Sequence, residues 1–377
     1  MKNLLVVYRE TRGGEFIATQ NLTSNLKKIN PKKIYVQKIK DLEINWHPKV
    51  RLQLVFNFFK SSLRFCQVIW NYRQKNISTY YSTSLLFLSL GHLINSILNR
   101  QAVCFYHFHG RDHDTLAKEL NKEQNFLRKI FYIFPFYSFL FWLEKNALNN
   151  VRTIFLPSPS ALRELEELFD QKLRKKTIII PNGVNHRIFY PPTSLASNHK
   201  AKFKILYVGR VDFSKHIDLL FETYSILKNK INCQLDLVIP KIIDDNINQW
   251  FFQLRQKTKV KVLIDLEPPK IADCYRQADL TLLLSAKDNF PLAYLESLSC
   301  GTPMLISNIN DLLPCQKKIS RQLIIDTLNR NSLVKRVLQY YFLPKKEKNR
   351  IKKSCLKVAK NFNWEKSAKM LYQKINE

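Results

Sequence analysis

Glycine is scarce in this chain, with only 7 in 377 residues. Glycine is the default residue where the backbone needs a positive φ or must approach a ligand closely. Because so few glycines are present, each marks a candidate turn or binding loop. Six of the seven lie in loop-like segments, namely Gly13, Gly14, Gly110, Gly183, Gly209 and Gly301.

Paired cysteines and long apolar runs are also missing. The 7 cysteines are odd in number and never form a Cys-x-x-Cys pair, which argues against a disulfide framework or a zinc site. Residues 76–99 are too polar and residues 130–143 too short to span a bilayer. The apolar run within residues 1–10 is too short for a signal peptide. These absences predict a cytoplasmic protein, either soluble or peripheral at the inner face of the membrane.

Acidic residues are outnumbered, with 30 Asp and Glu against 61 Lys and Arg and a formal charge of +31. Such an excess attracts nucleic acid, anionic lipid or anionic saccharide. No zinc-finger, ribonucleoprotein or basic-zipper pattern accompanies the charge, so no specific nucleic-acid partner is predicted. An anionic membrane surface fits better, because each nearby Lys or Arg gains about 1 kcal/mol there. A general lysine bias of the source proteome is the alternative explanation.

Strand-like and helix-like segments alternate along the chain in two series. The predicted strands cover residues 4–8, 33–38, 102–107, 153–156 and 177–180, and then 204–208, 235–239, 260–263, 280–284, 304–306 and 323–325. The predicted helices include one from Gly13-Gly14 to about Lys28, one with Ser160 as its N-cap, and residues 218–228 and 271–277. Such alternation predicts parallel sheets with right-handed crossovers. The fold class is therefore α/β, with two doubly wound, Rossmann-like domains facing across a cleft.

Domain borders follow from the composition. Residues 1–185 are expected to form the first domain, and residues 186–202, which are rich in Pro, Ser and Asn, a linker. Residues 203–355 form the expected second domain, and residues 356–377 a separate C-terminal helix.

Two acids stand eight positions apart in the most informative stretch, residues 285–304. Asp288 lies in a loop closed by Pro291, and Glu296 lies in an apolar helical run that ends at Gly301-Thr302-Pro303. The strand-like run 280–284 precedes them. Both acids are therefore expected at the carboxyl end of a strand, where open α/β sheets bind ligands.

Several motifs, taken in order, resemble a known family. They are Gly13-Gly14-Glu15, His109-Gly110-Arg111-Asp112, Pro181-Asn182-Gly183-Val184-Asn185, Val208-Gly209-Arg210 with Lys215, Asp288 to Glu296, and Phe362-Asn363-Trp364-Glu365. This set resembles the retaining nucleotide-sugar glycosyltransferases of family 4, which have the GT-B fold. The resemblance implies that the first domain is the acceptor side, that the second binds the nucleotide sugar, and that residues 356–377 return to the first domain.

The resemblance assigns a role to each charged motif residue. Arg210 and Lys215 match positions that bind the donor diphosphate, where cations stabilise the charge of the leaving group. They make a metal ion dispensable, so no cofactor besides the nucleotide-sugar co-substrate is implied. Glu296 matches the acid that holds the ribose hydroxyls, and a carboxylate can accept both hydrogen bonds of a diol. Asp288 matches an acid near the transferred sugar.

The remaining candidates act through the backbone or through an imidazole. Gly13 and Gly14 match a Gly-Gly turn at which backbone amides approach the donor. His109 resembles a histidine near the donor sugar and is assigned, with Asp288 and Glu296, to the catalytic set. The backbone N–H groups of Asn289, Phe290 and Leu292 are candidate contacts to the sugar and phosphates. On a simple count, His107, His109 and His113 suggest a metal cluster, but no fourth ligand is evident.

Three positions depart from the family pattern. Asp288 replaces the usual Glu and is one methylene shorter. His216 stands where glycine normally follows the lysine, and Pro240 stands where glycine normally follows the strand. These changes alter loop geometry around the nucleotide without removing a charge.

Two apolar segments have open interpretations. Residues 52–70 place a wide apolar stripe opposite Lys60 and Arg64, which suits a membrane-surface helix or a helix packed on its own sheet. Residues 130–143, which are rich in Phe, suit a membrane contact or a buried segment.

The sequence thus predicts a hexosyltransferase-type enzyme that transfers a sugar from a nucleotide sugar to a saccharide or lipid-linked saccharide, with retention of configuration. Cell-surface polysaccharide or glycolipid synthesis is the expected setting. A catalytically inactive GT-B scaffold and a basic polyanion-binding protein are the alternatives.

Overall fold

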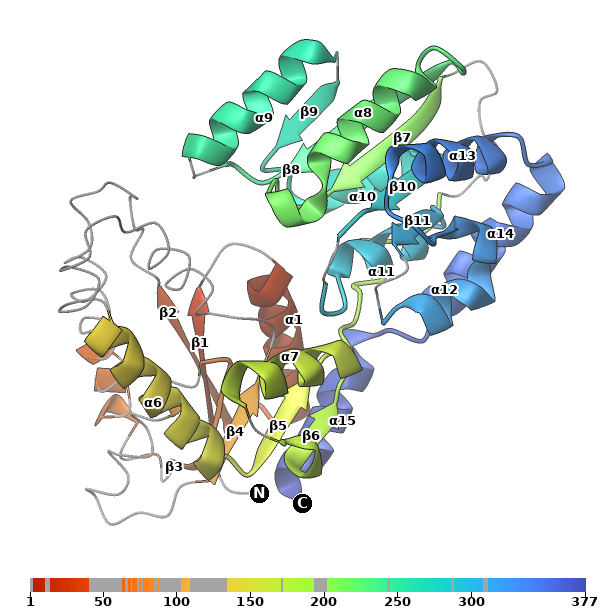
Figure 1. Ribbon diagram of the computed structural model, residues 1–377. Helices are drawn as coiled ribbons and strands as arrows, with labels where there is room; N and C mark the ends of the chain where they lie inside the picture. The colour runs from red at the N-terminus through yellow and green to blue at the C-terminus, as the bar shows by residue number, and fades with distance from the viewer. Residues whose placement is uncertain are drawn as a thin grey trace. The chain divides into compact units, whose positions relative to one another are not determined.

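The structure is a computed structural model, and its chain forms two compact units (Figure 1). The first unit comprises Met1–Pro181 and Ser367–Glu377, and the second comprises Asn182–Lys366. The structure describes residues 3–10, 14–40, 63–64, 67–68, 70–72, 75, 77–84, 87–88, 103–108, 134–170, 172–192, 202–242, 245–258, 260–285, 288–307 and 311–377.

The described part of the first unit is a parallel sheet with helices on both faces. Its strands are β1 (Asn3–Glu10), β2 (Ile34–Lys40), β3 (Ile77–Ser82), β4 (Val103–His107), β5 (Thr153–Leu156) and β6 (Thr177–Ile179), in the order β2-β1-β3-β4-β5-β6. Its helices are α1 (Gly14–Ile29), α6 (Phe134–Asn150), α7 (Pro159–Phe169) and α15 (Trp364–Asn376), the last beginning in the second unit. Helices α6 and α7 contribute to the core on one face, through residues such as Leu148 and Leu165.

The second unit is built in the same way. Its strands are β7 (Phe203–Val208), β8 (Cys233–Ile239), β9 (Lys261–Ile264), β10 (Leu280–Leu283), β11 (Met304–Ser307) and β12 (Ile324–Ile325). Its helices are α8 (Ile217–Leu227), α9 (Asp245–Lys257), α10 (Pro268–Gln277), α11 (Leu292–Ser299), α12 (Leu313–Ile319), α13 (Arg330–Tyr341) and α14 (Lys345–Ala359). All the described pairings are parallel, which confirms the α/β prediction for both units.

The strand order of the second sheet indicates where along the sheet a ligand would bind. The order is β12-β11-β10-β7-β8-β9, so the chain winds outward from β7 in one direction and from β10 in the other. Leu280 pairs with Ile205 although 75 residues separate them. The carboxyl ends of β7 and β10 flank a topological switch point, which is where doubly wound sheets bind ligands.

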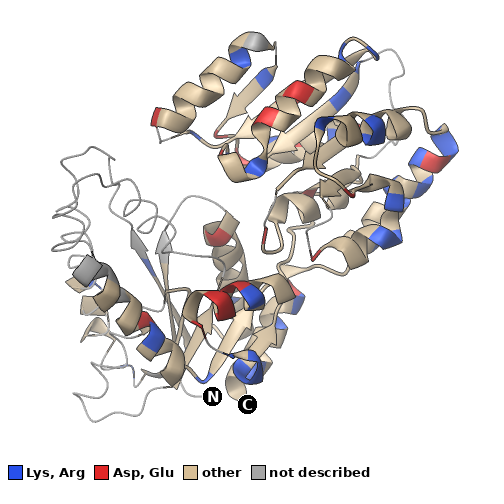
Figure 2. Cartoon of the chain, in the orientation of Figure 1, with Lys and Arg blue, Asp and Glu red and all other residues tan. Residues whose placement is uncertain are grey.

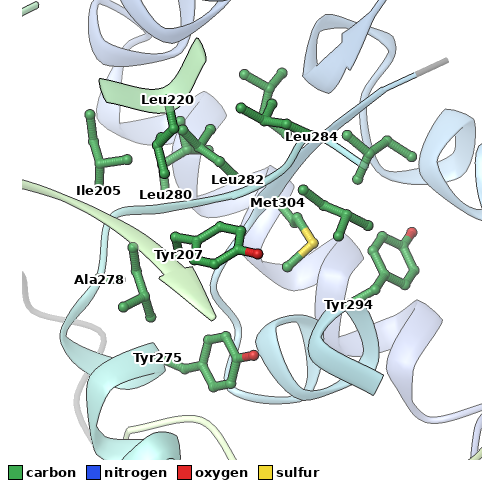
Figure 3. Packing of buried hydrophobic residues seen from close by; sticks show 14 of the residues in the cluster. Ile205, Tyr207, Leu220, Tyr275, Ala278, Leu280, Leu282, Leu284, Tyr294 and Met304 are labelled. Atoms are coloured by element: carbon green, nitrogen blue, oxygen red, sulfur yellow. The ribbon is translucent and has the colours of Figure 1, made fainter. Parts of the chain in front are cut away.

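Large buried side chains hold this sheet and its helices together (Figure 3). Leu280 and Leu282 of β10 are buried beside Leu220 of α8 and Met304 of β11. Tyr207, Tyr275 and Tyr294 belong to the same cluster and are almost fully buried. Tyrosine combines a large apolar ring with a hydroxyl that needs a partner. Tyr207 and Tyr275 use their hydroxyls to join the core to the polar site described below, whereas Tyr294 bonds to Gln316.

The structure corrects one helix start and adds elements that the sequence did not reveal. The N-cap of α7 is Ser158 and not Ser160, because Pro159 occupies the first helical turn and the Ser158 hydroxyl accepts from Ala161 N at 3.4 Å. Strand β3 was not predicted, since its sequence, ISTYYS, is polar and lies in a long uncharged segment. Helices α6, α9, α12, α13 and α14 were not identified as helices either.

The borders of the compact units differ slightly from the expected domain limits. The chain changes unit at Pro181–Asn182 and at Lys366–Ser367, whereas residues 185 and 356 were expected. Residues 186–192 are not a free linker, because Phe189 is buried in the core of the second unit. The chain's last segment is again part of the first unit, where Asn30 Nδ2 donates to Tyr372 Oη at 3.3 Å.

Gly183 is required where two segments of the second unit cross. A Cβ at this position would lie 2.3 Å from Trp364 N and 2.6 Å from Asn363 C, and both atoms belong to backbone that cannot swing aside. We expect Gly183→Ala to destabilise the protein by about 2 kcal/mol or more, as overpacking of a closed site does. Chemical denaturation measures this change. Gly14→Ala is the matched control, since a Cβ there meets nothing within 4 Å, and an equal loss in both variants would contradict the explanation.

Candidate functional site

The loop after β7 carries two of the predicted cations. Gly209 and Arg210 follow the strand. Residues Phe213–Lys215 form a 3₁₀ turn capped by Asp212, whose side chain accepts from Ser214 N at 2.9 Å. The Arg210 carbonyl accepts from Tyr207 Oη at 2.6 Å, so a buried core tyrosine fixes the start of this loop. The Arg210 side chain itself is 68% exposed, with Asp212 Oδ2 4.0 Å away.

His216 explains why glycine is usual at its position. Its φ is 50° and its ψ 47°, which is the left-handed conformation, and it serves both as C-cap of the 3₁₀ turn and as N-cap of α8. A residue with a Cβ pays roughly 1–2 kcal/mol there, whereas glycine pays little. The substitution is therefore accommodated with strain, and the turn keeps its shape.

Lys215 and Asp288 form a close ion pair across the switch point. Lys215 Nζ lies 2.7 Å from Asp288 Oδ2, and the two side chains are only 13% and 21% exposed. The lysine comes from the loop after β7 and the aspartate from the loop after β10. Asp288 thus reaches the cation in spite of being one methylene shorter than glutamate. Because little solvent screens the pair, the attraction is stronger than in an exposed pair.

The entry to α11 is held in an unusual conformation. Phe290 has φ 65°, a value that is rare for an aromatic residue. Its carbonyl accepts from Asn182 Nδ2 at 2.9 Å, and its ring lies 5.2 Å from the ring of Phe362. Leu292 is the first residue of α11. Asn182, in the Pro-Asn-Gly motif 108 residues earlier, therefore fixes the backbone beside Asp288 and Asn289.

Glu296 lies one turn into α11 with a single direct side-chain partner among the described hydrogen bonds. Tyr275 Oη donates to Glu296 Oε2 at 3.3 Å, and Tyr275 is fully buried. Burial raises the pKa of Glu296 to about 7, and the hydrogen bond from Tyr275 opposes the rise only in part. The residue as a whole is half-buried.

Hydrogen bonds behind Glu296 keep α11 in place. Ser297 Oγ donates to Thr302 O at 2.8 Å and lies 2.7 Å from Thr281 Oγ1 of β10. Thr302 Oγ1 in turn donates to Tyr275 O at 2.6 Å. The helix that carries Glu296 is thus tied to the strand beneath it and to the segment that supplies Tyr275, a rigid support of the kind that binding sites need.

The predicted site residues fall into four groups in the structure. Lys215 and Asp288 are in contact, and Glu296, Asn289, Phe290 and Leu292 lie in the same loop-and-helix segment as Asp288. Arg210 lies in the loop of Lys215, with its exposed side chain near Asp212. Gly14 is the first residue of α1, in the first unit. Gly13 and His109 lie outside the described residues.

Sequence reasoning missed two supporting residues. Asn182 belongs to the Pro-Asn-Gly motif, but the sequence does not indicate that its side chain donates to the carbonyl of Phe290. No spacing pattern points to Tyr275 as the partner of Glu296, because 21 residues separate them.

The segments considered for membrane contact are described in part. Within residues 52–70, only 63, 64, 67, 68 and 70 are described, and Leu63 is exposed. Of residues 130–143, α6 exposes Phe139 and Trp142, whose rings stack with centroids 6.2 Å apart. Phe141 packs inward, so this helix combines a buried and an exposed aromatic side.

Metal ligands and membrane spans can be assessed for the described residues only. Within them, no three His, Cys, Asp or Glu side chains are grouped to hold a metal ion. His107 is buried, and its Nδ1 forms a hydrogen bond with Tyr81 Oη, while His109 and His113 are outside the described residues. None of the described helices has the length and apolar character needed to cross a bilayer.

Comparison with known proteins finds a family similar to part of the second unit. Residues 194–355 match the family described as glycosyl transferases group 1. The matched region contains the loop of Arg210 and Lys215 and the segment from Asp288 to Glu296, so the ion pair and the buried glutamate both lie within it.

Curated relatives and solved structures are also similar to this chain. The chain is 26% identical over 184 residues to the D-inositol 3-phosphate glycosyltransferase of Thermobispora bispora, which covers 45% of this chain and 43% of that protein. The match thus spans less than half the length of the relative. The fold resembles sucrose-phosphate synthase of Thermosynechococcus elongatus (TM-score 0.73, 17% identity, 100% and 98% of the two chains covered). It also resembles Anabaena HepE in complex with UDP-glucose (TM-score 0.71, 13% identity, 99% of each chain covered). The two Rossmann-like domains therefore have the GT-B architecture.

Proposed function

We propose that this protein is a family 4 glycosyltransferase that transfers a sugar from a nucleotide-sugar donor to a saccharide or lipid-linked saccharide acceptor, with retention of configuration. The group 1 domain and the enzyme relatives support sugar transfer as the reaction class. The sequence resemblance to family 4 supports retention. The complex of Anabaena HepE with UDP-glucose supports a nucleotide sugar as the donor.

The observation that carries this proposal is the pairing of Lys215 with Asp288 beside Glu296. A cation held 2.7 Å from a carboxylate at a switch point is a preformed anion site whose charge is balanced until a ligand arrives. A diphosphate offers more negative charge than one aspartate, so it displaces the carboxylate from Lys215. The freed Asp288 can then accept hydrogen bonds from hydroxyl groups of the donor sugar. The ion pair thereby links phosphate binding to sugar binding.

The same residues suit the chemistry of transfer. The bond between the anomeric carbon and the phosphate oxygen breaks, and its electron pair leaves with the diphosphate. Lys215 and the exposed Arg210 stabilise that growing charge, which lowers the barrier. A hydroxyl oxygen of the acceptor forms the new bond, and its proton passes to the departing phosphate. Glu296 holds the nucleotide by its ribose, and His109 is assigned to the donor sugar by resemblance.

The cofactor requirement and the cellular setting are part of the proposal. Arg210 and Lys215 supply the positive charge that a metal ion supplies in other transferases, so we propose a metal-independent reaction. The net charge of +31 favours binding to an anionic membrane surface, which we place at the inner face of the membrane. The proposed pathway is the synthesis of cell-surface polysaccharide or glycolipid. The exposed Phe139 and Trp142 of α6 support such a contact in the first unit.

Thermal unfolding with UDP, GDP and ADP tests the donor site. A ligand at 100 times its dissociation constant stabilises the native state by about 2.7 kcal/mol, which raises the melting temperature by roughly 5 °C or more. We expect one nucleotide to produce this shift in the wild type and a shift of about half that size or less in Lys215→Ala. If none of the three moves the curve, the inactive scaffold becomes the better interpretation. Donor hydrolysis or transfer with the stabilising nucleotide sugar then distinguishes an enzyme from a binding protein.

A further inference from the structure

Helix α14 presents a continuous row of cations on one face. Residues 345–360 contain eight Lys and Arg and a single acid, Glu347. The cations that form the row follow one another at intervals of four, three, four and three residues, which keeps them on one side of a helix with 3.6 residues per turn. All five are exposed, and we call them the α14 stripe: Lys346, Arg350, Lys353, Lys357 and Lys360.

The opposite face of α14 is buried, so the α14 stripe points into solvent. Ile351, Cys355, Val358 and Ala359 are buried in the core of the second unit. At 1.5 Å per residue the stripe is about 21 Å long. Only Arg350 has a carboxylate partner among the described ion pairs, with its nitrogen 2.8 Å from Glu347 Oε2. Three cations of the helix lie outside the stripe. Lys345 is its first residue, Lys352 is half-buried, and Lys348 is turned inward and donates to Tyr341 O at 2.6 Å.

Among the described helices, a row of five exposed cations is found on α14 alone. Figure 2 shows basic residues along α14, whereas α8 of the same unit carries acids on its surface. The exposed positions of α8 include Asp218 and Glu222, four residues apart. A general lysine bias predicts cations on every helix, so it does not explain why one helix carries an unbroken row and another carries acids.

We infer that the α14 stripe is a docking surface for an anionic lipid bilayer. This surface would make the membrane contact of the proposed function, and the inference holds whether or not the protein transfers a sugar. Each Lys or Arg near such a surface contributes about 1 kcal/mol, or roughly a fivefold gain in affinity, so a row of five is sufficient for stable association. Charge complementarity is thus the first argument for this partner.

An exposed aromatic residue near the start of α14 favours lipid over nucleic acid. Phe342 lies three residues before the start of α14 and is 71% exposed, with its ring 5.0 Å from that of Tyr341. Aromatic side chains next to cations suit the interface between headgroups and acyl chains. Nucleic-acid surfaces instead place aromatic side chains among their cations to stack bases, and the α14 stripe itself contains none.

Vesicle binding with two charge-matched variants tests this inference. The stripe variant combines Lys346→Gln, Arg350→Gln, Lys353→Gln and Lys357→Gln. The control variant combines Lys228→Gln, Lys230→Gln, Lys261→Gln and Lys270→Gln, which removes the same charge from exposed positions elsewhere on the second unit. The full chain is sedimented with two kinds of vesicle, one of phosphatidylcholine alone and one that also contains about 30% phosphatidylglycerol. The salt concentration is about 0.15 M, the physiological ionic strength.

We expect the wild type and the control variant to bind the anionic vesicles and neither to bind phosphatidylcholine alone. The stripe variant should bind roughly 100-fold more weakly or worse. An equal loss of affinity in both variants would mean that only net charge matters and would overturn the inference. The inference would also be overturned if the stripe variant bound anionic vesicles as tightly as the wild type, or if the wild type did not bind them. Stronger binding of the wild type to single-stranded or duplex nucleic acid, lost in the stripe variant, would assign the surface to that partner instead. The nucleotide-induced melting shift should persist in the stripe variant, so a failed donor site and a failed docking surface give different results.

Discussion

Replacing Lys215 by alanine is expected to weaken binding of the donor nucleotide by roughly 10- to 100-fold, since a charge-assisted hydrogen bond contributes about 1.5–3 kcal/mol. The lysine is only 13% exposed and lies 2.7 Å from Asp288, so it is already oriented when the diphosphate arrives. The rate of transfer should fall further than the affinity, because the cation also stabilises the charge that develops on the leaving group. Isothermal titration calorimetry with the stabilising nucleotide measures the first effect, and single-turnover kinetics the second.

Two further variants distinguish the effect of losing the Lys215 charge from the effect of misfolding. Asp288→Asn removes the carboxylate that competes with phosphate for the lysine. It should bind the free nucleoside diphosphate as tightly as the wild type or several-fold more tightly, while transfer from the nucleotide sugar declines. Lys228→Ala, at an exposed position just after α8, should leave both quantities unchanged. Unchanged nucleotide affinity in Lys215→Ala, with the protein folded, would remove Lys215 from the donor site.

Glu296 is expected to make both stability and nucleotide binding depend on pH around neutrality. Burial raises the pKa of its carboxyl to about 7, from 4.5 for a glutamate in water. The folded protein therefore holds the proton more tightly than the unfolded chain does. The resulting stabilisation is fully present below about pH 4.5 and is lost as the pH rises through about 7, with a total change of up to about 3 kcal/mol. Chemical denaturation at a series of pH values measures the slope.

Nucleotide binding should change with pH in the opposite direction. The ionised carboxylate accepts hydrogen bonds from the ribose hydroxyls, so the ligand favours the deprotonated form, and its affinity should rise as the pH increases from about 6 to about 8. The change is at most about tenfold per pH unit below the pKa.

Glu296→Gln keeps the shape of the side chain and cannot ionise. It should be more stable than the wild type at about pH 8, because no buried charge remains, and its nucleotide affinity should be weak and independent of pH in this range. Tyr275→Phe removes the hydrogen bond that partly opposes the rise, so the midpoint of the transition should move to higher pH. Parallel pH profiles for the wild type and Glu296→Gln would show that another group is responsible.

Local patterns predicted much of the fold. The strands at Thr153–Leu156 and near Phe203–Val208 were recognised because short apolar runs between turn residues are a local signal. Polar or amphipathic elements gave weaker signals, and β3 and α14 were missed for that reason. The N-cap of α7 was misplaced by two residues because both Ser158 and Ser160 have the appropriate side chain, and only the position of Pro159 in the folded helix distinguishes them.

The sequence by itself determined the α/β class and the chemical types that the site contains, since alternation of elements and the motif residues are both legible along the chain. Only the tertiary structure decided that β10 lies beside β7, which brings Asp288 to Lys215 across 73 positions. It also placed Tyr275 against Glu296 and Asn182 against the carbonyl of Phe290. The physical reason is that strand order and side-chain contact depend on how distant segments pack together, whereas composition and periodicity report only what a segment does with its neighbours in the chain.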